Sequence, residues 1–490
     1  MEPLVGYAPD LASNTPGILT NCAALVPSLK GMRGAPTPKN TTLPALSKAA
    51  RGAALVRKLD NSTRLLVGTE DAIYESASTS WTDRKNGSGY TLSSDSTWRF
   101  AQFGDLTLAA AKTQILQSST SGAFADTDSN APAAGIVEVV NGFVFLADVN
   151  DQGSVFDSAD RPHGWWAARD PEVWTPSVAN EAYTGSLTST PGKCTAARRF
   201  GQTIIVYKER SMYRGIYVGT AGWEFELIPG EAGAFSQEVV IDIGTPENPI
   251  HLFMGADDFY RFDGARPVPI GSPLRETVFS ELNSAYSHGC KALHDRANSR
   301  VYFYYPVANS INPDKCVVYN YRTSRWGRDD RSIEAVVEYI AAGMTYDDLG
   351  THYVTYDDLP SVSYDLAFFS GGNPTPAIIN TAHVLQTLDG AAQTSTMETG
   401  DYGSDEFVSF LSRVQPLFLT KPASAMMVNK YRDNLGDPLT ADTAVAMDSK
   451  GRFDVSNGGR SANWHRAEFA FTGDVEMQAL NAELMEDSPE

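Results

Sequence analysis

The stretch VEVVNGFVFLAD, residues 137–148, places two apolar runs on either side of Gly142. Valine, phenylalanine and leucine favour pleated, half-buried strands. Glycine accepts the positive φ angles of a tight turn without steric cost. The stretch therefore predicts two antiparallel strands joined by a short turn, which is a β-hairpin.

The same form recurs along the chain. Five further hairpins are predicted at LLVGTEDAIYE (Gly68), FAQFGDLTLAA (Gly104), ARRFGQTIIVYKE (Gly201), HLFMGADDFYRFD (Gly255) and DRANSRVYFYYP (Asn298). Successive turns lie 36, 38, 59, 54 and 43 residues apart. A four-stranded propeller blade takes about 40 to 50 residues. These intervals predict an all-β fold whose body is a six-bladed β-propeller.

The composition divides the chain into five parts. Residues 1–50 contain seven prolines, which predict an extended arm lying over a surface. Residues 51–335 form the predicted propeller body, and residues 336–400 an insertion or linker, or the piece that completes the propeller. Alternating apolar residues resume from about 407, so residues 401–485 are predicted to form a second, smaller antiparallel β domain. Residues 486–490 are an acidic tail.

The totals exclude several classes of protein. With 490 residues and 42 % hydrophobic residues the chain is long enough for two or three domains with real cores. A formal charge of -20 disfavours gripping nucleic acid by its phosphates. Cys22, Cys194, Cys290 and Cys316 are scattered, which predicts reduced, buried thiols. The beginning of the chain does not resemble a signal peptide and no apolar stretch reaches membrane-spanning length, so we expect synthesis in a cytoplasm without membrane insertion.

Catalytic motifs are absent from the sequence. It contains no Gly-x-Ser-x-Gly elbow, no phosphate-binding loop and no dinucleotide-binding glycine motif opening a helix. Tyrosines and carboxylates are abundant, but no pair of acids stands out as a glycosidase pair. We therefore expect no enzyme activity, no cofactor and no catalytic residues, and the sequence names no channel or interface residues.

One short segment could gather a metal ion. In SHGCKALHD, the residues His288, Cys290, His294 and Asp295 have side chains that bind zinc. Their spacing matches no known metal pattern, so a polar loop is the preferred interpretation and no metal site is predicted.

The stretch TYDDLGTHYVTYDDLPSVSYD, residues 345–365, repeats a tyrosine followed by acids. A calcium loop of the EF-hand kind alternates its acids, whereas Asp347 and Asp348, like Asp357 and Asp358, are adjacent. Adjacent aspartates before Leu-Gly or Leu-Pro are typical of turns. A strand-and-turn element, with Tyr346, Tyr356 and Tyr364 as anchors, is therefore preferred over a metal site.

Tryptophans tend to close the predicted hairpin units. Trp81, Trp174, Trp223 and Trp326 stand near the ends of these units. Packing across to a neighbouring sheet is the preferred role, and stacking against a sugar is the alternative.

Several stretches together resemble the tail nozzle or tail hub proteins of short-tailed bacteriophages, of the packaged-DNA-stabilisation type. They are GYAPDLASNTPGILTNCAALVPSLKGM, RPHGWWAARDPEVWTPSVANEAYTG, FGQTIIVYKERSMYRG, HLFMGADDFYRFDGARPVPIG, VYNYRTSRWG and GGRSANWHRAEFAFTG. The resemblance covers most of the chain. None of these stretches is a catalytic signature, and no gate or interface residue carries over.

The resemblance implies a structural protein of the virion tail, assembled in the host cytoplasm. Such proteins form a homo-hexamer below the portal and the head-to-tail adaptor, carry tail fibres, tailspikes or a needle, and surround viral DNA without binding it sequence-specifically. Six copies would together carry a charge of -120 (6 × -20). An acidic channel wall offers no phosphate-binding sites, so DNA would pass without adhering.

Two other functions remain open at this point. A carbohydrate-binding or polysaccharide-degrading propeller of a phage tail needs acids and stacked aromatic rings in one cleft. A cellular propeller that scaffolds protein partners needs neither.

Overall fold

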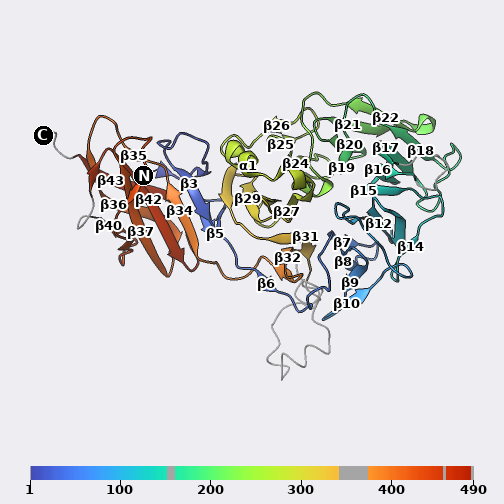
Figure 1. Cartoon of the computed structure of the whole chain (residues 1–490), viewed down its shortest axis with the longest axis horizontal. Coiled ribbons are helices and arrows are strands. Elements are labelled where there is room, and N and C mark those ends of the chain that lie inside the picture. The colour runs from blue at the N-terminus through green and yellow to red at the C-terminus, as the bar shows by residue number, and fades with distance from the viewer. Residues whose placement is uncertain (1, 152–159, 341–373, 456–459, 487–490) are drawn as a thin grey trace, which may run out of the picture.

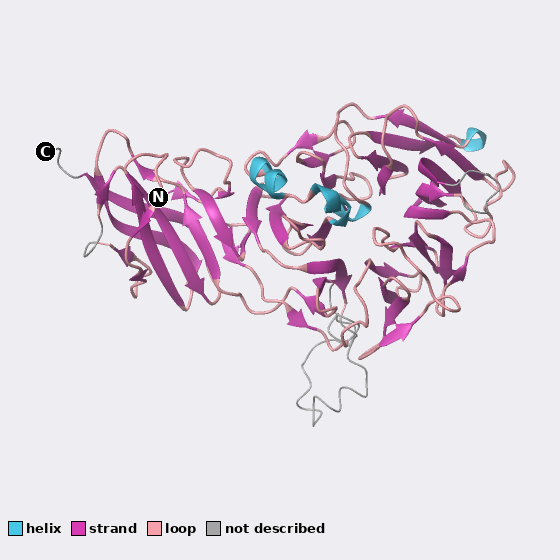
Figure 2. Cartoon of the chain, in the orientation of Figure 1, coloured by secondary structure: helices cyan, strands magenta, loops and turns pink. Residues whose placement is uncertain are grey.

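The computed structural model describes residues 2–151, 160–340, 374–455 and 460–486. A ring of β-sheets forms one end of the molecule, and a separate stack of β-strands, which contains both termini, forms the other (Figures 1 and 2). Neighbouring strands are antiparallel throughout the ring. The predicted fold class, an all-β β-propeller with a smaller antiparallel β domain, is confirmed.

Four blades of the ring are separate four-stranded sheets. They consist of β7 (Ala53–Arg57), β8 (Thr63–Gly68), β9 (Ile73–Ser76) and β10 (Trp81–Asp83); β19 (Cys194–Phe200), β20 (Thr203–Lys208), β21 (Met212–Tyr217) and β22 (Trp223–Leu227); β23 (Val240–Asp242), β24 (His251–Met254), β25 (Phe259–Phe262) and β26 (Val268–Pro269); and β31 (Ile333–Tyr339), β32 (Thr375–Asn380), β33 (Leu385–Thr387) and β6 (Lys39–Asn40). The predicted count of six blades is therefore wrong.

Other four-strand groups of the ring are merged into larger sheets. An eight-stranded sheet joins β11 (Arg99–Phe103), β12 (Leu106–Ala111), β13 (Gln114–Ser119) and β14 (Ala125–Asp126) to β15 (Ala133–Val140), β16 (Phe143–Asn150), β17 (Asp160–Ala168) and β18 (Ala182–Ser186). An eleven-stranded sheet begins with β27 (Lys291–Asp295), β28 (Arg300–Tyr305), β29 (Lys315–Asn320) and β30 (Arg325–Arg328).

The predicted number of blades was wrong because the turn motifs do not join the same two strands in every blade. Gly104, Gly142 and Gly201 lie between the first and second strands of their groups, whereas Gly255 follows β24, the second strand of its blade. In the blade of β31 no short turn joins the first two strands, and its outer strand β6 comes from the N-terminal segment. The short turn of this blade, between β32 and β33, contains no glycine, so a search for glycine turns misses it.

Three of the predicted turn glycines have the backbone conformation that the hairpins require. The φ angles of Gly104, Gly142 and Gly201 are 59°, 72° and 63°. Gly68 differs, because it ends β8 and the turn follows at Thr69. Its Cα lies against the buried indole of Trp98, so glycine is needed there for close packing.

The second domain is a sandwich of two sheets. One sheet continues the eleven-stranded sheet through β43 (Glu476–Glu486), β36 (Ser409–Thr420), β40 (Phe453–Asp454), β41 (Ser461–Ala462) and β1 (Glu2–Pro3). The other contains β2 (Gly6–Tyr7), β3 (Ile18–Ala23), β34 (Ser395–Thr399), β35 (Tyr402–Gly403), β37 (Ser424–Arg432), β38 (Thr440–Ala441), β39 (Val445–Ala446) and β42 (Trp464–Thr472). Phe453 and Phe469, one from each sheet, pack edge to face with centroids 5.2 Å apart.

The N-terminal segment is part of both domains. Its strands β4 (Leu25–Pro27) and β5 (Met32–Gly34) lie between β30 of the propeller and β43 of the sandwich. Leu4, Leu19, Leu25 and Met32 are at most 1 % exposed. The segment is extended, as its prolines predict, but it is a buried component of the core rather than an arm on a surface.

The expected boundary at residue 335 falls inside β31. The expected insertion 336–400 contributes β32 and β33 to a blade and β34 to the sandwich. The TYDDL repeats and residues 487–490 of the acidic tail lie outside the described residues.

Tryptophans pack between neighbouring sheets of the ring. Trp326 of β30 lies 4.9 Å from Phe259 of β25, and Trp223 of β22 lies 5.5 Å from Phe143 of β16, measured between ring centroids. Trp326, Trp174 and Trp166 are at most 2 % exposed. These positions support the packing role predicted from the sequence.

Helices are few among the described residues. They are α1 (Arg275–Glu281) and the 3₁₀ turns η1 (Gly219–Ala221), η2 (Gln237–Val239) and η3 (Ser284–Gly289). Asp10 of the N-terminal segment accepts hydrogen bonds from the backbone N–H groups of Glu276 and Thr277, at the start of α1. No described helix is long and apolar enough to span a membrane.

Replacing Gly68 by alanine should destabilise the propeller. A Cβ atom there would lie 2.1 Å from Cδ1 of Trp98, and the indole is held by a hydrogen bond to the carbonyl oxygen of Thr69. We expect Gly68→Ala to cost about 1–3 kcal/mol of unfolding free energy, seen as a lower urea midpoint. Gly122→Ala is the control, since no atom lies within 4 Å of the position that its Cβ would take, and should change stability by less than about 0.5 kcal/mol. Equal effects would contradict this explanation.

Candidate functional site

The sheets of the propeller are arranged in a ring (Figure 2). Residues of the first strands of the blades line a series of cavities. The largest, about 460 Å³, is lined by residues of β7, β19, β23, β27 and β31. A second cavity of about 120 Å³ shares Arg198 and Glu238 with it. A third of about 130 Å³ shares Arg99 with the second. These cavities form the central channel of the propeller.

A half-buried ion pair, with side chains 15 % and 17 % exposed, lies where the second and third cavities meet. Arg99 at the start of β11 donates from Nε and Nη2 to the two carboxylate oxygens of Glu238 in η2, at 2.9 and 3.0 Å. Its remaining Nη1 donates to the carbonyl oxygen of Gly135 in β15. This two-pronged geometry is the strong form of an arginine–carboxylate contact. It ties together segments from three parts of the ring.

The electrostatic state of Glu238 follows from its neighbours. Burial alone would raise the pKa of the carboxyl group, but the positive charges of Arg99 and Lys291 hold it at about 2. Glu238 is therefore ionised at any physiological pH.

Arg198 of β19 makes a second set of contacts in the channel. Its Nε donates to the carbonyl oxygen of Val240 at 3.2 Å, and its Nη2 donates to that of Gln237 at 2.9 Å. Its Nη1 lies 3.5 Å from the carboxylate of Glu138 in β15. Burial raises the pKa of Glu138 although Arg198 opposes the shift. Arginines thus connect first strands and loops of different blades through the channel.

The chemistry of this lining is that of paired charges. Cys194, which lines the third cavity, has a pKa raised to about 12 by burial, so it remains a protonated thiol. The described lining of the largest cavity contains no tryptophan, tyrosine or phenylalanine on which a sugar could stack.

The four residues of the possible zinc site do not come together. His288 lines the third cavity and His294 lines the largest one, so they lie toward opposite ends of the channel. Asp295 instead accepts hydrogen bonds from the backbone N–H and the side chain of Asn298 across a hairpin turn. Among the described residues there is no group of three or more histidine, cysteine or acidic side chains placed to hold a metal ion.

All four cysteines are buried and none forms a disulfide, which confirms the prediction of buried thiols. Burial raises the pKa of Cys22 and of Cys290 to about 12. These thiols are therefore unreactive components of the core.

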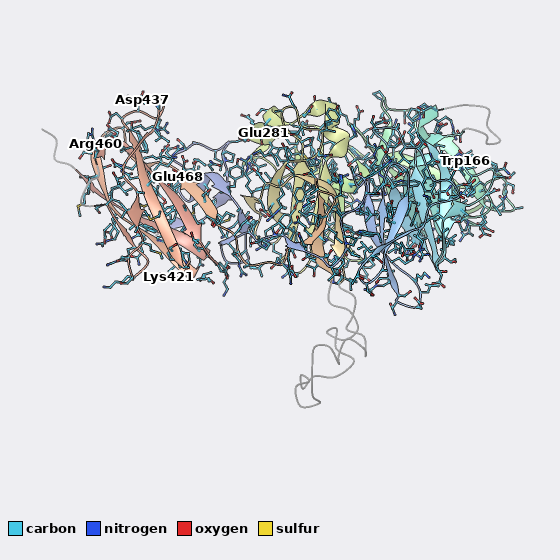
Figure 3. The ribbon with its side chains drawn as sticks, turned by 60° about the horizontal axis from the view of Figure 1, so that its bottom comes forward. Trp166, Glu281, Lys421, Asp437, Arg460 and Glu468 are labelled. Atoms are coloured by element: carbon cyan, nitrogen blue, oxygen red, sulfur yellow. The ribbon has the colours of Figure 1, made fainter. Side chains whose placement is uncertain are left out.

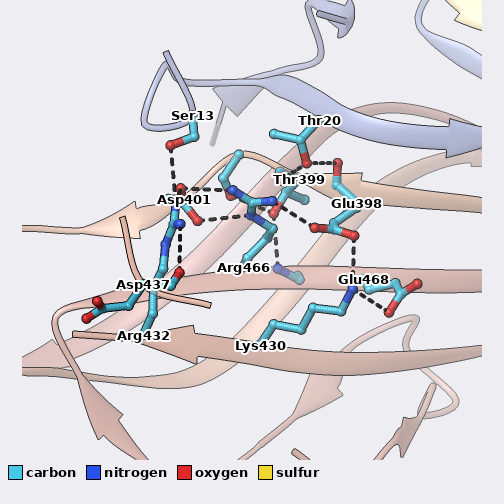
Figure 4. Close-up of polar contacts among 12 residues, drawn as sticks. Ser13, Thr20, Glu398, Thr399, Asp401, Lys430, Arg432, Asp437, Arg466 and Glu468 are labelled. Atoms are coloured by element: carbon cyan, nitrogen blue, oxygen red, sulfur yellow. Dashed lines mark hydrogen bonds and ion pairs between the residues drawn. The ribbon is translucent and has the colours of Figure 1, made fainter. Parts of the chain in front are cut away.

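A second buried charge cluster lies in the sandwich (Figure 4). Asp401, whose side chain is fully buried, accepts hydrogen bonds from Arg466 at 2.9 and 3.0 Å and from Arg432 at 2.5 Å. Arg466 also donates to Glu398 at 2.8 Å. The backbone N–H of Asp401 donates to the carbonyl oxygen of Ser13 in the N-terminal segment. The cluster therefore fastens this segment to the sandwich.

The two charge clusters belong to different domains. Figure 3 places Glu468, which borders the sandwich cluster, far from Trp166 in the propeller. Glu281 lies between them, where its carboxylate accepts a hydrogen bond from Tyr305 at 2.7 Å.

Neither cluster was found from the sequence. The available signal was a charged residue inside an otherwise apolar first strand, as in WRFAQF (98–103) and ARRF (197–200). Such a charge is costly to bury without a partner. The partners themselves, Glu238 for Arg99 and Asp401 for Arg466, lie 139 and 65 residues away.

Glu238 should make stability depend on pH. Its pKa is about 2 in the folded protein against an ordinary 4.5, so the ionised form stabilises the fold above pH 4.5 and this contribution disappears as the pH falls toward 2. We expect Glu238→Gln to cost about 3 kcal/mol at pH 7, with the gap to the unmodified protein closing between pH 4.5 and 2. Urea midpoints measured across that range test this.

The exposed Glu226 offers a matched control. Glu226→Gln should leave the midpoints nearly unchanged at every pH. A gap for Glu238→Gln that stays constant down to pH 2 would contradict the assignment.

Removing the charge of Asp401 should loosen the sandwich. Asp401→Asn leaves two guanidinium groups without their shared buried anion, which should cost about 3–5 kcal/mol. The surface pair of Asp454 with Arg413 provides the control, since both side chains are at least 35 % exposed, and Asp454→Asn should cost less than about 1 kcal/mol. Chemical unfolding measures the loss of unfolding free energy in both variants. Similar losses would contradict a larger stabilising role for the buried cluster than for the surface pair.

No protein-family model and no curated protein matches the chain. Among solved structures, one described as YCF48 bound to D1 peptide aligns with a TM-score of 0.38 and 12 % sequence identity. The alignment covers 76 % of this chain and 99 % of that one.

Proposed function

We propose that this chain is a structural virion protein, the subunit of a hexameric tail nozzle or hub in a short-tailed bacteriophage. In this role it continues the DNA channel below the portal and adaptor, helps retain the packaged DNA and guides its ejection. The hexamer also carries fibres, tailspikes or a needle. The sequence resemblance introduces this function, and the continuous sheet of the structure and the acidic charge of the chain support it.

The observation that carries the proposal is the eleven-stranded sheet. It runs from the propeller through β4 and β5 into β43 and β36 of the sandwich, so backbone hydrogen bonds cross the junction between the domains. Domains joined by a flexible linker move independently. A continuous sheet makes one stiff, elongated unit, which suits a part that must withstand force from a pressurised genome.

The central channel of the propeller is too small to be the DNA path. Its largest cavity measures about 460 Å³, the volume of a cube about 8 Å on a side, whereas the major groove of a DNA duplex alone is about 12 Å wide. In the proposed hexamer DNA therefore passes between the six subunits. The formal charge of -20 on each chain disfavours adhesion of the phosphates to that wall.

The described residues offer little to a polysaccharide-degrading function. The tryptophans that could stack on a sugar, such as Trp166, Trp174 and Trp326, are buried. The acids Glu138 and Glu238 of the channel are engaged by arginines.

Imaging tests the proposal directly. The purified chain, mixed with the portal and adaptor proteins of the same virion, should form rings with six-fold symmetry in negative-stain micrographs. A map of the intact tail should then contain six copies below the adaptor, each with its propeller and sandwich in the arrangement of Figure 1.

Tails that lack this chain would refute the proposal. Release of reducing sugars from host surface polysaccharide by the purified chain would favour the carbohydrate-active alternative instead. The chain alone, without its adaptor, serves as the control for assembly.

A further inference from the structure

Lys291 is a buried cation with no direct partner among the described residues. It begins β27, is only 7 % exposed and lines the cavity of about 120 Å³ in the central channel. None of the described residues forms a hydrogen bond or an ion pair with its ammonium group. A buried ammonium in such a place is costly unless something compensates its charge.

The carboxylate that acts on Lys291 through space is already occupied. Glu238 raises the pKa of Lys291, but burial and the charge of Arg99 lower it, and the net direction is downward. Both carboxylate oxygens of Glu238 accept hydrogen bonds from Arg99. Glu238 therefore neutralises Arg99 first and leaves the ammonium of Lys291 uncompensated.

The cavity is electropositive although the whole chain is acidic. Its ionisable lining residues are Arg99, Arg198, Lys291 and Glu238. With Glu138, whose carboxylate lies 3.5 Å from Arg198, the count is three positive charges against two negative charges. The chain as a whole carries -20. A local excess of positive charge in an enclosed, low-dielectric space favours an anion.

The dimensions restrict what that anion can be. A volume of about 120 Å³ equals the space of about four water molecules in the liquid. An inorganic oxyanion with five heavy atoms fits it, whereas a nucleotide does not. The shared lining residues Ala53, Ala54 and Val336 place the cavity next to the larger one.

We propose that this cavity is a binding site for a small tetrahedral oxyanion, of which inorganic phosphate is the representative, held by the ammonium group of Lys291. The ion's oxygens accept hydrogen bonds from Lys291 and compensate the charge that Glu238 leaves unpaired. Bound there, the ion compensates the charge of Lys291 at the start of β27, in a cavity that is also lined by Arg99 of β11 and Arg198 of β19. The inference does not depend on the tail-nozzle function.

Thermal unfolding of the full chain provides the solution test. Sodium phosphate is titrated against sodium chloride of equal ionic strength. We expect phosphate, and not chloride, to raise Tm saturably by about 1–3 °C, since a ligand that binds only the folded state stabilises it by mass action. In Lys291→Met this rise should vanish.

A second expectation concerns the stability of Lys291→Met in the absence of phosphate. Without phosphate, Lys291→Met should be at least as stable as the unmodified protein, because the substitution removes an uncompensated buried charge. Lys450→Met, at an exposed turn position, is the matched control and should keep the full phosphate response. If Lys291 had a structural role without an anion, Lys291→Met would be less stable than the unmodified protein in both buffers.

Crystals soaked in selenate locate the site independently of any variant. An anomalous difference peak within hydrogen-bonding distance of Nζ of Lys291 is expected. The proposal is overturned if phosphate gives no saturable rise beyond chloride, if Lys291→Met keeps the rise, or if the cavity contains only water in the soaked crystals. If Lys291→Met does not fold, the selenate peak and the phosphate titration of the unmodified protein still test the proposal.

Discussion

A β-strand at the edge of a sheet leaves a row of backbone N–H and C=O groups unpaired, and the architecture of this protein depends on how three such edges are covered. Strand β6 pairs with β33 and completes the last blade, β4 pairs with β30, and β5 pairs with β43. All three covering strands come from one N-terminal segment, residues 25–40. That segment therefore contributes to closing the ring and attaches the ring to the sandwich with the same kind of bond that holds each sheet together.

Charged residues lie where the blades contact each other and where the sandwich contacts the N-terminal segment. Arg99, Arg198 and Glu238 connect blades inside the channel, and Asp401, Arg432 and Arg466 hold the sandwich to the loop around Ser13. A buried ion pair adds little net stability compared with apolar packing, but an arrangement that leaves one partner unpaired is strongly disfavoured. Such ion pairs disfavour arrangements in which the wrong segments pack together. The aromatic contacts between sheets, as at Trp326 and Phe259, bury apolar surface and so stabilise the native arrangement.

The described channel is lined by charged residues. Arg99 and Arg198 lie against carboxylates, and the ammonium group of Lys291 is left for the proposed ion. The stiffness of the continuous sheet and the acidic charge of the chain are the properties that a tail nozzle would use. The carbohydrate-active alternative requires exposed aromatic rings beside free acids, and the tryptophans and channel acids described above are buried or paired.

Local chemistry made much of the fold predictable. The glycines at 104, 142 and 201 mark hairpins because only the turn itself demands their positive φ angles, and alternating apolar residues identify the strands of the sandwich. The burial of the four cysteines also followed from their scattered spacing. Gly68 shows the limit, since the same local signal arose there from contact with Trp98, which lies 30 residues further along the chain.

The strands, their turns and the all-β class can be read from the amino-acid sequence, because they depend on residues within a few positions of each other. The number of blades, the place of the N-terminal segment and the partners of the buried charges become known only once the chain is folded. The blade that closes the ring joins residues 39–40 to residues 385–387, and Arg99 meets Glu238 across 139 positions. Contacts of this kind depend on which chain segments meet in space, and no local pattern of residues records that choice.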